Sequence, residues 1–265
     1  MKKHYMLFTL LFTLLPFLNS YAEENKAITI PQLSFSSPTS GYRLEIPETI
    51  LGDRNGGETD RSGKSFTISA WINMDQYTNN SGSKGNVIMG HGPRVHMNYN
   101  GSLVLATTET GVLKIISGAS NKVTSVLETS VDLDTWTYLT LVYDNSDFSV
   151  SVYKDGTLVA TKNNTQQLEL FGDDPCIFFV GGAGFSGFCD EFQFFDRALN
   201  SNDVKQAYSN PQNISGLTVW YDFNTIEEGS SFTNKVTESD QVNTKATFYN
   251  LTGGQTNSDG GYISI

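Results

Sequence analysis

The residues best suited to chemistry in this sequence lie in one stretch, GFSGFCDEFQFFDRALNSNDVKQAYSNP, which covers residues 184–211. It places three acids, Asp190, Glu191 and Asp196, among five phenylalanines. Two carboxyl groups in a cleft are what a glycoside hydrolase uses to cleave a sugar linkage, and carboxylates are also preferred ligands of Ca²⁺. The same acids can equally belong to the solvent face of a strand. The spacing of the acids along the chain helps to distinguish these alternatives.

The spacing of these acids does not favour catalysis. Side chains alternate along a strand, so two faces are expected: Cys189, Glu191, Gln193 and Phe195 on one, and Phe188, Asp190, Phe192 and Phe194 on the other. The second face carries three phenylalanines, so we expect it to face the core and to draw Asp190 inward. A catalytic pair on one strand needs a spacing of two or four residues, whereas Glu191 and Asp196 are five apart.

Other reactive residues are sparse. His91 and His96 flank GPRV in what we expect to be a loop, and their five-residue spacing lacks a third zinc ligand nearby. No serine stands in the G-x-S-x-G context of a nucleophile elbow. We therefore predict no catalytic residue, and no enzyme activity.

The N-terminal residues 1–22 read as a secretory signal. A basic start at Lys2 and Lys3 precedes the apolar run YMLFTLLFTLLPFL, and small residues lead to Ala22. We expect the mature chain to begin near Glu23 and to be exported to the periplasm, the cell surface or the medium. No later segment approaches the roughly 20 apolar residues of a membrane helix, so no membrane span is expected.

Charge and composition narrow the partners and the fold class. The net charge is -11, and -13 without Lys2 and Lys3, which argues against nucleic acid and anionic membranes and is compatible with neutral glycans or cations. The chain is rich in Gly, Ser, Thr, Asn, Tyr and Phe, a composition typical of many short strands joined by tight turns.

Alternating apolar and polar residues predict an all-β fold. The clearest runs are 42–46, 65–74, 101–108, 111–117, 122–127, 137–144 and 148–154. Asp155-Gly156 separates two such runs and predicts a tight hairpin. One short helix is expected near 201–208, capped by Asn200 or Ser201 and stopped before Pro211.

The two cysteines, Cys176 and Cys189, leave two alternatives open. In an exported chain they could form a disulfide between antiparallel strands. They could equally be two small buried thiols, because free cysteine behaves as a small hydrophobe.

Three stretches together resemble a known family. They are SFTISAWINM, with Trp71; DTWTYLTLVYDNSDFSVSVYKDGTLVAT, with Trp136, Tyr143, Tyr153, Asp155 and Gly156; and FSGFCDEFQFFDRALNSNDVKQAY, with Gly187, Asp190, Glu191, Arg197, Ala198, Leu199 and Val204. Their order resembles the laminin-G-like domains of the concanavalin A-like lectin/glucanase superfamily. The resemblance implies a two-sheet antiparallel jelly-roll sandwich.

The C-terminal region departs from the family order. SGLTVWYDFNTIEEGSSF resembles the segment with which the family usually begins. We therefore expect residues 23–265 to form a single domain in which 216–265 supply the first strands in circularly permuted order. A second, incomplete domain is the alternative.

A structural calcium ion is the cofactor that the resemblance suggests, since related domains often hold one near the Asp-Glu segment, and Asp190 is the candidate ligand. Ser36, Ser37 and Ser40 stand where acids and a glycine are usual in the family. That replacement favours a structural role, in which Asp190 accepts hydrogen bonds from loop amides.

The function predicted is that of an exported, non-catalytic binding module, with carbohydrate as the leading ligand. A module that binds a surface protein in adhesion is the alternative, and a glycoside hydrolase with an unrecognised acid pair is the third hypothesis. Trp71, Trp136 and Trp220 lie in strand-like runs and are expected in the core. Ligand contacts are expected instead from loop residues, namely Tyr77, Asn79, Asn80, Arg94, Asn98, Tyr99 and Phe185.

Overall fold

The fold is known from a computed structural model. It describes residues 26–30, 42–51, 63–78, 85–93, 102–117, 122–163, 167–168, 170, 176–224, 226–227, 231–232, 234–236, 247–250 and 262–264. The expected signal at 1–22 lies outside these ranges. No helix within them has the length and apolar character needed to cross a bilayer.

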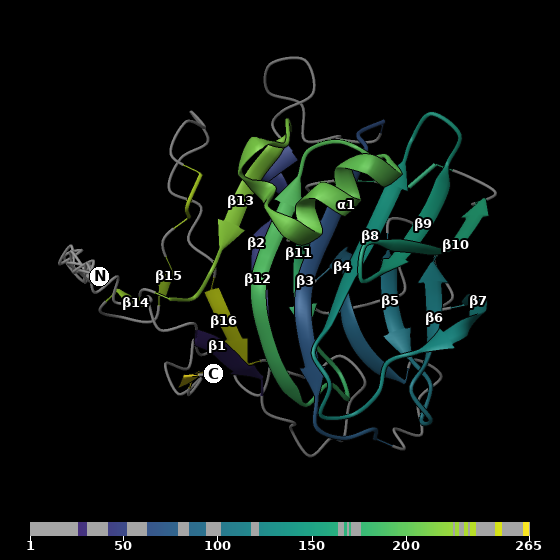
Figure 1. The fold of residues 1–265 in the computed structure, drawn as a ribbon. Coiled ribbons are helices and arrows are strands. Elements are labelled where there is room, and N and C mark those ends of the chain that lie inside the picture. The colour runs from purple at the N-terminus through teal and green to yellow at the C-terminus, as the bar shows by residue number, and fades with distance from the viewer. Residues whose placement is uncertain are drawn as a thin grey trace, which may run out of the picture.

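Two antiparallel sheets pack face to face (Figure 1). The first, in spatial order, contains β10 (Thr157–Asn163), β9 (Ser149–Lys154), β8 (Thr137–Asp144), β3 (Phe66–Met74), β12 (Gly187–Phe195), β1 (Lys26–Ile30) and β17 (Tyr262–Ser264), and β13 (Leu217–Tyr221) also pairs with β12. The second contains β16 (Thr247–Asn250), β2 (Tyr42–Pro47), β11 (Cys176–Gly181), β4 (Asn86–Pro93), β5 (Leu103–Thr107), β6 (Val112–Ser117) and β7 (Lys122–Ser130). The expected jelly-roll sandwich is confirmed.

Three shorter elements and a small ribbon complete the described chain. They are η1 (Glu48–Leu51), α1 (Ser201–Ser209), η2 (Pro211–Asn213) and the pair β14 (Ile226–Glu227) and β15 (Ser231–Phe232).

The core lies between the inner faces of the two sheets. On β3 every second side chain, from Phe66 to Met74, is fully buried, as alternation along a strand requires. Rings from both sheets meet there: the Phe178 centroid lies 4.5 Å from that of Phe194 and 4.8 Å from that of Phe66. Such interleaving of the two inner faces is what holds a β-sandwich together.

The expected hairpin joins β9 to β10. Asp155 and Gly156 have φ angles of 50° and 73°, so both turn positions are left-handed, as a tight hairpin of this type requires. The Asp155 carboxylate also accepts a hydrogen bond from the Tyr138 amide at 2.9 Å, which ties the turn to β8.

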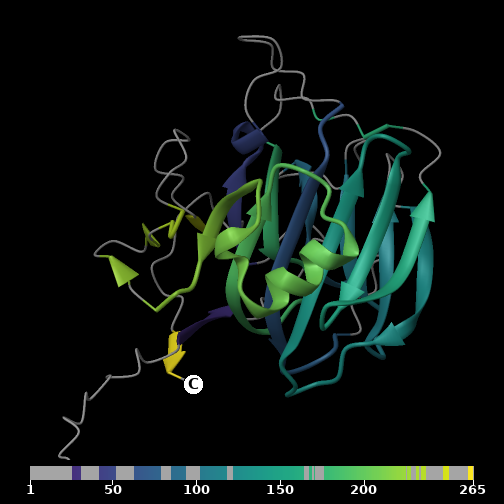
Figure 2. The ribbon, with the colours of Figure 1, turned by 45° about the horizontal axis from the view of Figure 1, so that its top comes forward.

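Helix α1 lies across the outer face of the eight-stranded sheet (Figures 1 and 2). The Asn200 side chain caps it by accepting from the amides of Asn202 and Asp203, as expected. Val204 and Ala207 are its buried residues, and they pack on outer-face side chains of the sheet such as Phe195. The helix therefore covers part of the outer face of the sheet. The part of that face beside the C-terminus of the helix is not covered by it.

The structure decides between the two alternatives for the cysteines and corrects one local expectation, the place of His91. Cys189 is a free thiol, fully buried in the core on β12, whereas Cys176 belongs to β11 in the opposite sheet. No disulfide joins them, and Cys189 follows the small-hydrophobe alternative. His91 is on strand β4 and not in a loop; it is fully buried, with its ring 4.7 Å from that of Phe178.

Strands from the C-terminal region join both sheets. β13 pairs with β12, β17 with β1, and β16 with β2. The single-domain assignment and the circularly permuted order stay predictions that agree with these pairings.

Candidate functional site

A β-bulge in β12 reorganises the face of the sheet. Asp190 pairs with Trp71 and Gln193 pairs with Ser69, so two residues of β12 oppose one residue of β3. Glu191 has a φ angle of 51°, a left-handed conformation that is uncommon for a residue with a side chain. An extra residue of this kind reverses the alternation beyond it.

Because of the bulge, the side chains of β12 are distributed between the two faces of the sheet differently from what alternation predicts. Phe192 and Phe194 do point into the core, but before the bulge it is Cys189 that points inward. Asp190 and Glu191, expected on opposite faces, line the same outer pocket together with Gln193. Asp190 is nonetheless 4% exposed, so it is buried within the outer face and not in the core.

The edge of β12 changes partner at the same point. β1 pairs with residues 187–189 of β12, whereas β13 pairs with residues 192–195. The two acids therefore lie where neither strand pairs with β12. Bulges are over-represented at sheet edges and next to active sites.

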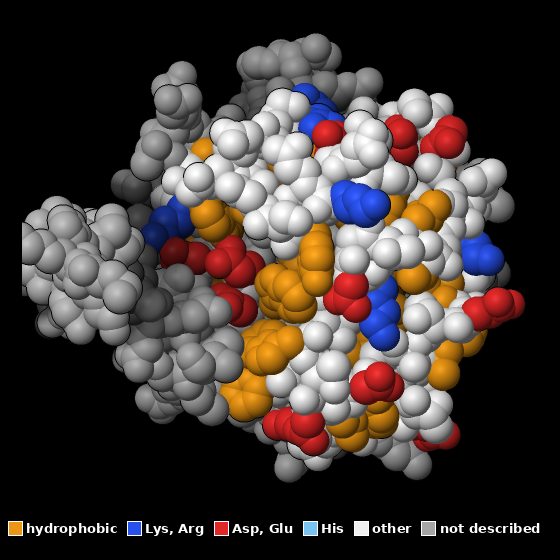
Figure 3. Space-filling view, viewed as in Figure 1, with side chains coloured by type: hydrophobic (Ala, Val, Ile, Leu, Met, Phe, Trp, Pro, Cys, Tyr) orange, Lys and Arg blue, Asp and Glu red, His pale blue; other side chains and the backbone are white. Residues whose placement is uncertain are grey.

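The pocket lies beside the C-terminus of α1 and has a volume of about 640 Å³. It is lined by Trp71, Trp136, Asp190, Glu191, Gln193, Ala207, Tyr208, Ser209, Asn210, Pro211, Gln212 and Trp220. Figure 3 shows hydrophobic side chains gathered at the centre of this face with acidic side chains beside them. The lining is thus aromatic on one side and acidic on the other.

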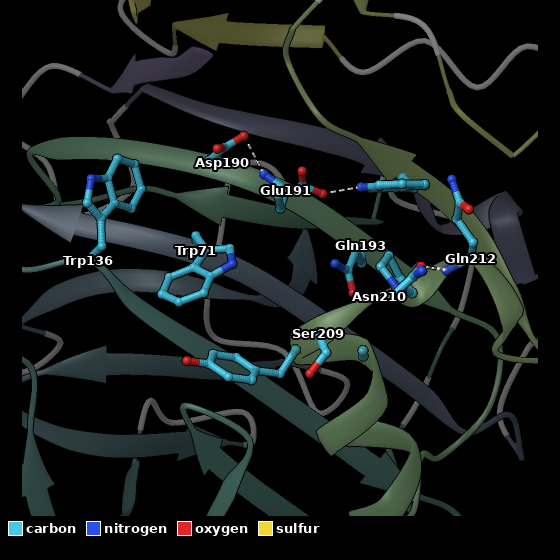
Figure 4. A pocket seen from close by; sticks show the side chains of 12 residues that line it. Trp71, Trp136, Asp190, Glu191, Gln193, Ser209, Asn210 and Gln212 are labelled. Carbon is cyan, nitrogen blue, oxygen red and sulfur yellow. Dashed lines mark hydrogen bonds between the residues drawn. The ribbon is translucent and has the colours of Figure 1, made fainter. Parts of the chain in front are cut away.

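The aromatic side is built from neighbouring strands and the helix end. The Trp71 ring lies 5.5 Å from that of Tyr138 and 5.4 Å from that of Tyr208, which is 38% exposed. In Figure 4 Trp71 and Gln193 lie below Asp190 and Glu191, and Trp136 lies to the left of the two acids. Trp71 and Trp136 are both half-buried, so each has ring surface that a ligand can contact.

The acidic side is held by a hydrogen-bonded network around Trp220. The Trp220 indole N–H donates to the Glu191 carboxylate, and the Asp190 carboxylate accepts from the Glu191 amide at 2.8 Å. Nearby, Lys235 forms an ion pair of 2.7 Å with Asp222. The hydrogen bonds to Glu191 and Asp190 hold both carboxylates in fixed positions at the pocket wall.

The surroundings of Glu191 disfavour its charged form. Burial is the largest cause and raises the pKa of its carboxyl above the ordinary value. The Trp220 hydrogen bond and the Lys235 charge oppose this rise in pKa, while the negative charge of Asp222 adds to it. Glu191 therefore takes up a proton at a higher pH than an exposed glutamate does.

A calcium site at Asp190 does not fit the described residues. Among them, no three His, Cys, Asp or Glu side chains lie close enough to hold a metal ion, whereas Ca²⁺ takes six to eight oxygens. Asp190 instead accepts an amide hydrogen bond from its own strand, at Glu191.

The loop residues expected to contact ligand do not form the pocket. Phe185 is 1% exposed within the core, so its prediction as a stacking residue is wrong. Tyr77 packs partly against the core, and its hydroxyl donates to the Val131 carbonyl, away from the pocket lining. Asn79, Asn80, Arg94, Asn98 and Tyr99 lie outside the described residues.

The tryptophans were the residues that sequence reasoning misplaced. Trp71, Trp136 and Trp220, expected in the core, all line the pocket. A signal was present: in SFTISAWINM, Trp71 alternates with Thr67 and Ser69 and not with the apolar residues. A tryptophan on the polar face of a strand indicates a surface site.

Chemically, the pocket offers ring faces beside hydrogen-bond acceptors. Exposed indole and phenol rings can stack on apolar faces of a ligand, and carboxylates can accept hydrogen bonds from its hydroxyl groups. The lining combines four aromatic side chains with six polar or acidic ones, so it offers both the apolar surface and the polar groups that a small-ligand site uses.

Comparison with protein families gives one match. The laminin G model described as the concanavalin A-like lectin/glucanases superfamily matches residues 54–205, more than half of the chain. No protein with a curated function matches this sequence.

Two solved structures share this fold at low sequence identity. A candidate carbohydrate-binding protein from Bacteroides ovatus superposes with a TM-score of 0.55 at 17% identity, over 87% of this chain. This chain spans 61% of that protein's length. The heptameric SAP-like pentraxin from Limulus polyphemus superposes with a TM-score of 0.50 at 14% identity, over 91% of this chain and 94% of the pentraxin. At such identities the likeness shows the fold alone.

Proposed function

This chain belongs to the concanavalin A-like lectin/glucanases superfamily, and from that premise we propose that it is an exported, non-catalytic module whose outer-face pocket binds carbohydrate. The observation that carries the proposal is the set of three half-buried tryptophans that line one pocket beside fixed carboxylates. The likeness to a candidate carbohydrate-binding protein supports it.

Binding would combine stacking with directed hydrogen bonds. A pyranose ring presents C–H groups on its faces and hydroxyl groups around its edge. The faces match the rings of Trp71, Trp136 and Tyr208, and the edge matches the carboxylates of Asp190 and Glu191. Aromatic contacts of this kind leave the sugar chemically unchanged.

The carboxylates have structural partners that favour binding over turnover. Glu191 accepts the Trp220 indole N–H, and Asp190 accepts the Glu191 amide. A hydrolase needs one carboxyl to donate a proton and the second to act on the opposite side of the linkage. Adjacent residues engaged with their own sheet are better suited to accepting hydrogen bonds from a ligand.

A glycan array followed by calorimetric titration of the best ligand tests the proposal. Trp71→Ala should weaken binding about 30-fold, equivalent to about 2 kcal/mol, the usual loss at a central aromatic contact. Leu158→Ala is the matched control, because Leu158 is 47% exposed on β10 and is not part of the pocket lining.

Two results would contradict this function. One is a glycan whose affinity is the same for Trp71→Ala and the unaltered protein, which would move the site elsewhere. The other is release of reducing sugar that disappears in Glu191→Gln, which would make the protein a hydrolase. Capture of a surface protein with no glycan retained at millimolar concentration would favour the adhesion alternative.

A further inference from the structure

We propose that this pocket selects its ligand by charge: it accepts uncharged glycans and rejects those that carry a carboxylate, such as sialic acid or uronic acid units. The inference rests on the proposed function and names the class of sugar that the same site takes.

The first step is the charge of the lining. Among the described residues that line the pocket, two are acids, Asp190 and Glu191, and none is Lys, Arg or His. Asp222 adds a third negative charge close enough to influence Glu191. A sugar carboxylate placed here would meet like charges and no cation from the lining.

The second step is that the described cation acting on Glu191 is already engaged. Lys235 forms its ion pair with Asp222 at 2.7 Å, and its backbone N–H donates to the Trp220 carbonyl, which fixes the segment along β13. Arg197, on the α1 side, pairs with Asp203 at 2.8 Å. Drawing Lys235 to an acidic sugar would require breaking its pair with Asp222.

The third step is the low exposure of the acids. Asp190 is 4% exposed and Glu191 is half-buried, so water screens their charge less than it would on an open surface. Like charges brought together at a poorly hydrated interface are strongly unfavourable. The same carboxylates form strong, charge-assisted hydrogen bonds with the hydroxyl groups of a neutral sugar.

The fourth step is the position of the acids relative to the rings. Glu191 accepts the indole N–H of Trp220 and lies above Trp71 in the close view of the pocket (Figure 4). A sugar stacked on Trp71 would therefore present its edge to the acids. Charge selection and stacking would act on the same sugar unit.

The test compares matched ligands by calorimetry. The probes are each neutral oligosaccharide retained on the array and the same oligosaccharide oxidised at its primary alcohols to uronic acids. We expect the oxidised form to bind at least about tenfold more weakly, a difference of roughly 1.4 kcal/mol. Glu191→Gln should narrow that gap while leaving stacking on Trp71 in place.

Salt provides a second measurement that needs no variant. Raising the ionic strength screens charge repulsion, so the gap between the affinities of the neutral and oxidised forms should narrow in the unaltered protein. This convergence should be smaller than for exposed charges, because the acids are partly buried. If Glu191→Gln does not fold, this convergence still decides the matter.

The outcomes separate the two proposals. Neutral binding with equal or tighter binding of the oxidised form would overturn charge selection and leave carbohydrate binding standing. Absence of binding by every neutral and acidic glycan would overturn carbohydrate binding, and charge selection with it.

Discussion

The two faces of the eight-stranded sheet differ in what fixes them. The inner face follows simple alternation, and its side chains on β3 and β12, such as Ile68 and Phe194, are fully buried. The outer face depends on a single irregularity, the bulge at Glu191, which brings Asp190, Glu191 and Gln193 to one pocket. The comparison teaches that the fold is set by a repeated pattern and the site by one local exception to it.

The strongest way to test that contrast is to truncate one phenylalanine on each face of β12. Phe194→Ala should lower the free energy of unfolding by about 3 to 5 kcal/mol, because Phe194 is fully buried against Phe178. Phe188→Ala, on the half-exposed outer face, should cost about 1 kcal/mol. Urea unfolding followed by circular dichroism measures both, and equal losses would contradict the contrast.

A middle-sized effect is expected from the network that fixes the acids. Trp220→Phe removes the indole N–H and leaves the Glu191 carboxylate without that donor, at a cost of about 1 to 3 kcal/mol in unfolding free energy. Trp136→Phe is the control, since the Trp136 ring lies 6.5 Å from that of Phe188 and the Glu191 carboxylate accepts its indole hydrogen bond from Trp220. Scanning calorimetry of both variants compares them; a loss no greater than that of the control would show that the network does not stabilise the bulge.

The smallest effect is a pH dependence confined to the outer face. The folded-state pKa of Glu191 lies above its ordinary value of 4.5 because of burial, so the folded chain takes up a proton before the unfolded chain does. As the pH falls from neutral through the folded pKa towards 4.5, the unaltered protein should gain stability relative to Glu191→Gln.

That pH effect is measured as the difference in Tm between the two proteins across the acidic range. Asp190, Asp222 and Lys235 face Glu191 and are present in both, so the subtraction removes most of their contribution. If the Tm of the unaltered protein stays constant or falls relative to that of Glu191→Gln as the pH drops, the folded-state pKa of Glu191 is not raised.

The sequence predicted the fold better than the site because the two depend on different signals. The fold was predicted from local preferences: alternation in runs such as 137–144, the turn at Asp155-Gly156, and the helix cap at Asn200. The structure contains the strand, the turn and the cap that these preferences predict. Local patterns of this kind suffice for strands, hairpins and helix ends.

The site was not predicted because it depends on the pairing between strands, which a local sequence pattern does not specify. A bulge forms where the pairing of β12 with β3 slips, and the eight letters FCDEFQFF read the same with or without it. The gap along the edge of β12 lies between β1 and β13, two strands that are far apart in the sequence. Of the site, only the placement of Trp71 among polar neighbours could have been read in advance.

The gathering of the tryptophans has a practical consequence in spectroscopy. The chain has three tryptophans, and all of them line the pocket, so the intrinsic tryptophan emission of this protein comes from one face. A bound sugar should change that emission directly, without any added label, and the nearby Glu191 should make it sensitive to acid. The core between the sheets holds none of them and contributes its own signal through Tyr143 and Tyr221, which are fully buried there.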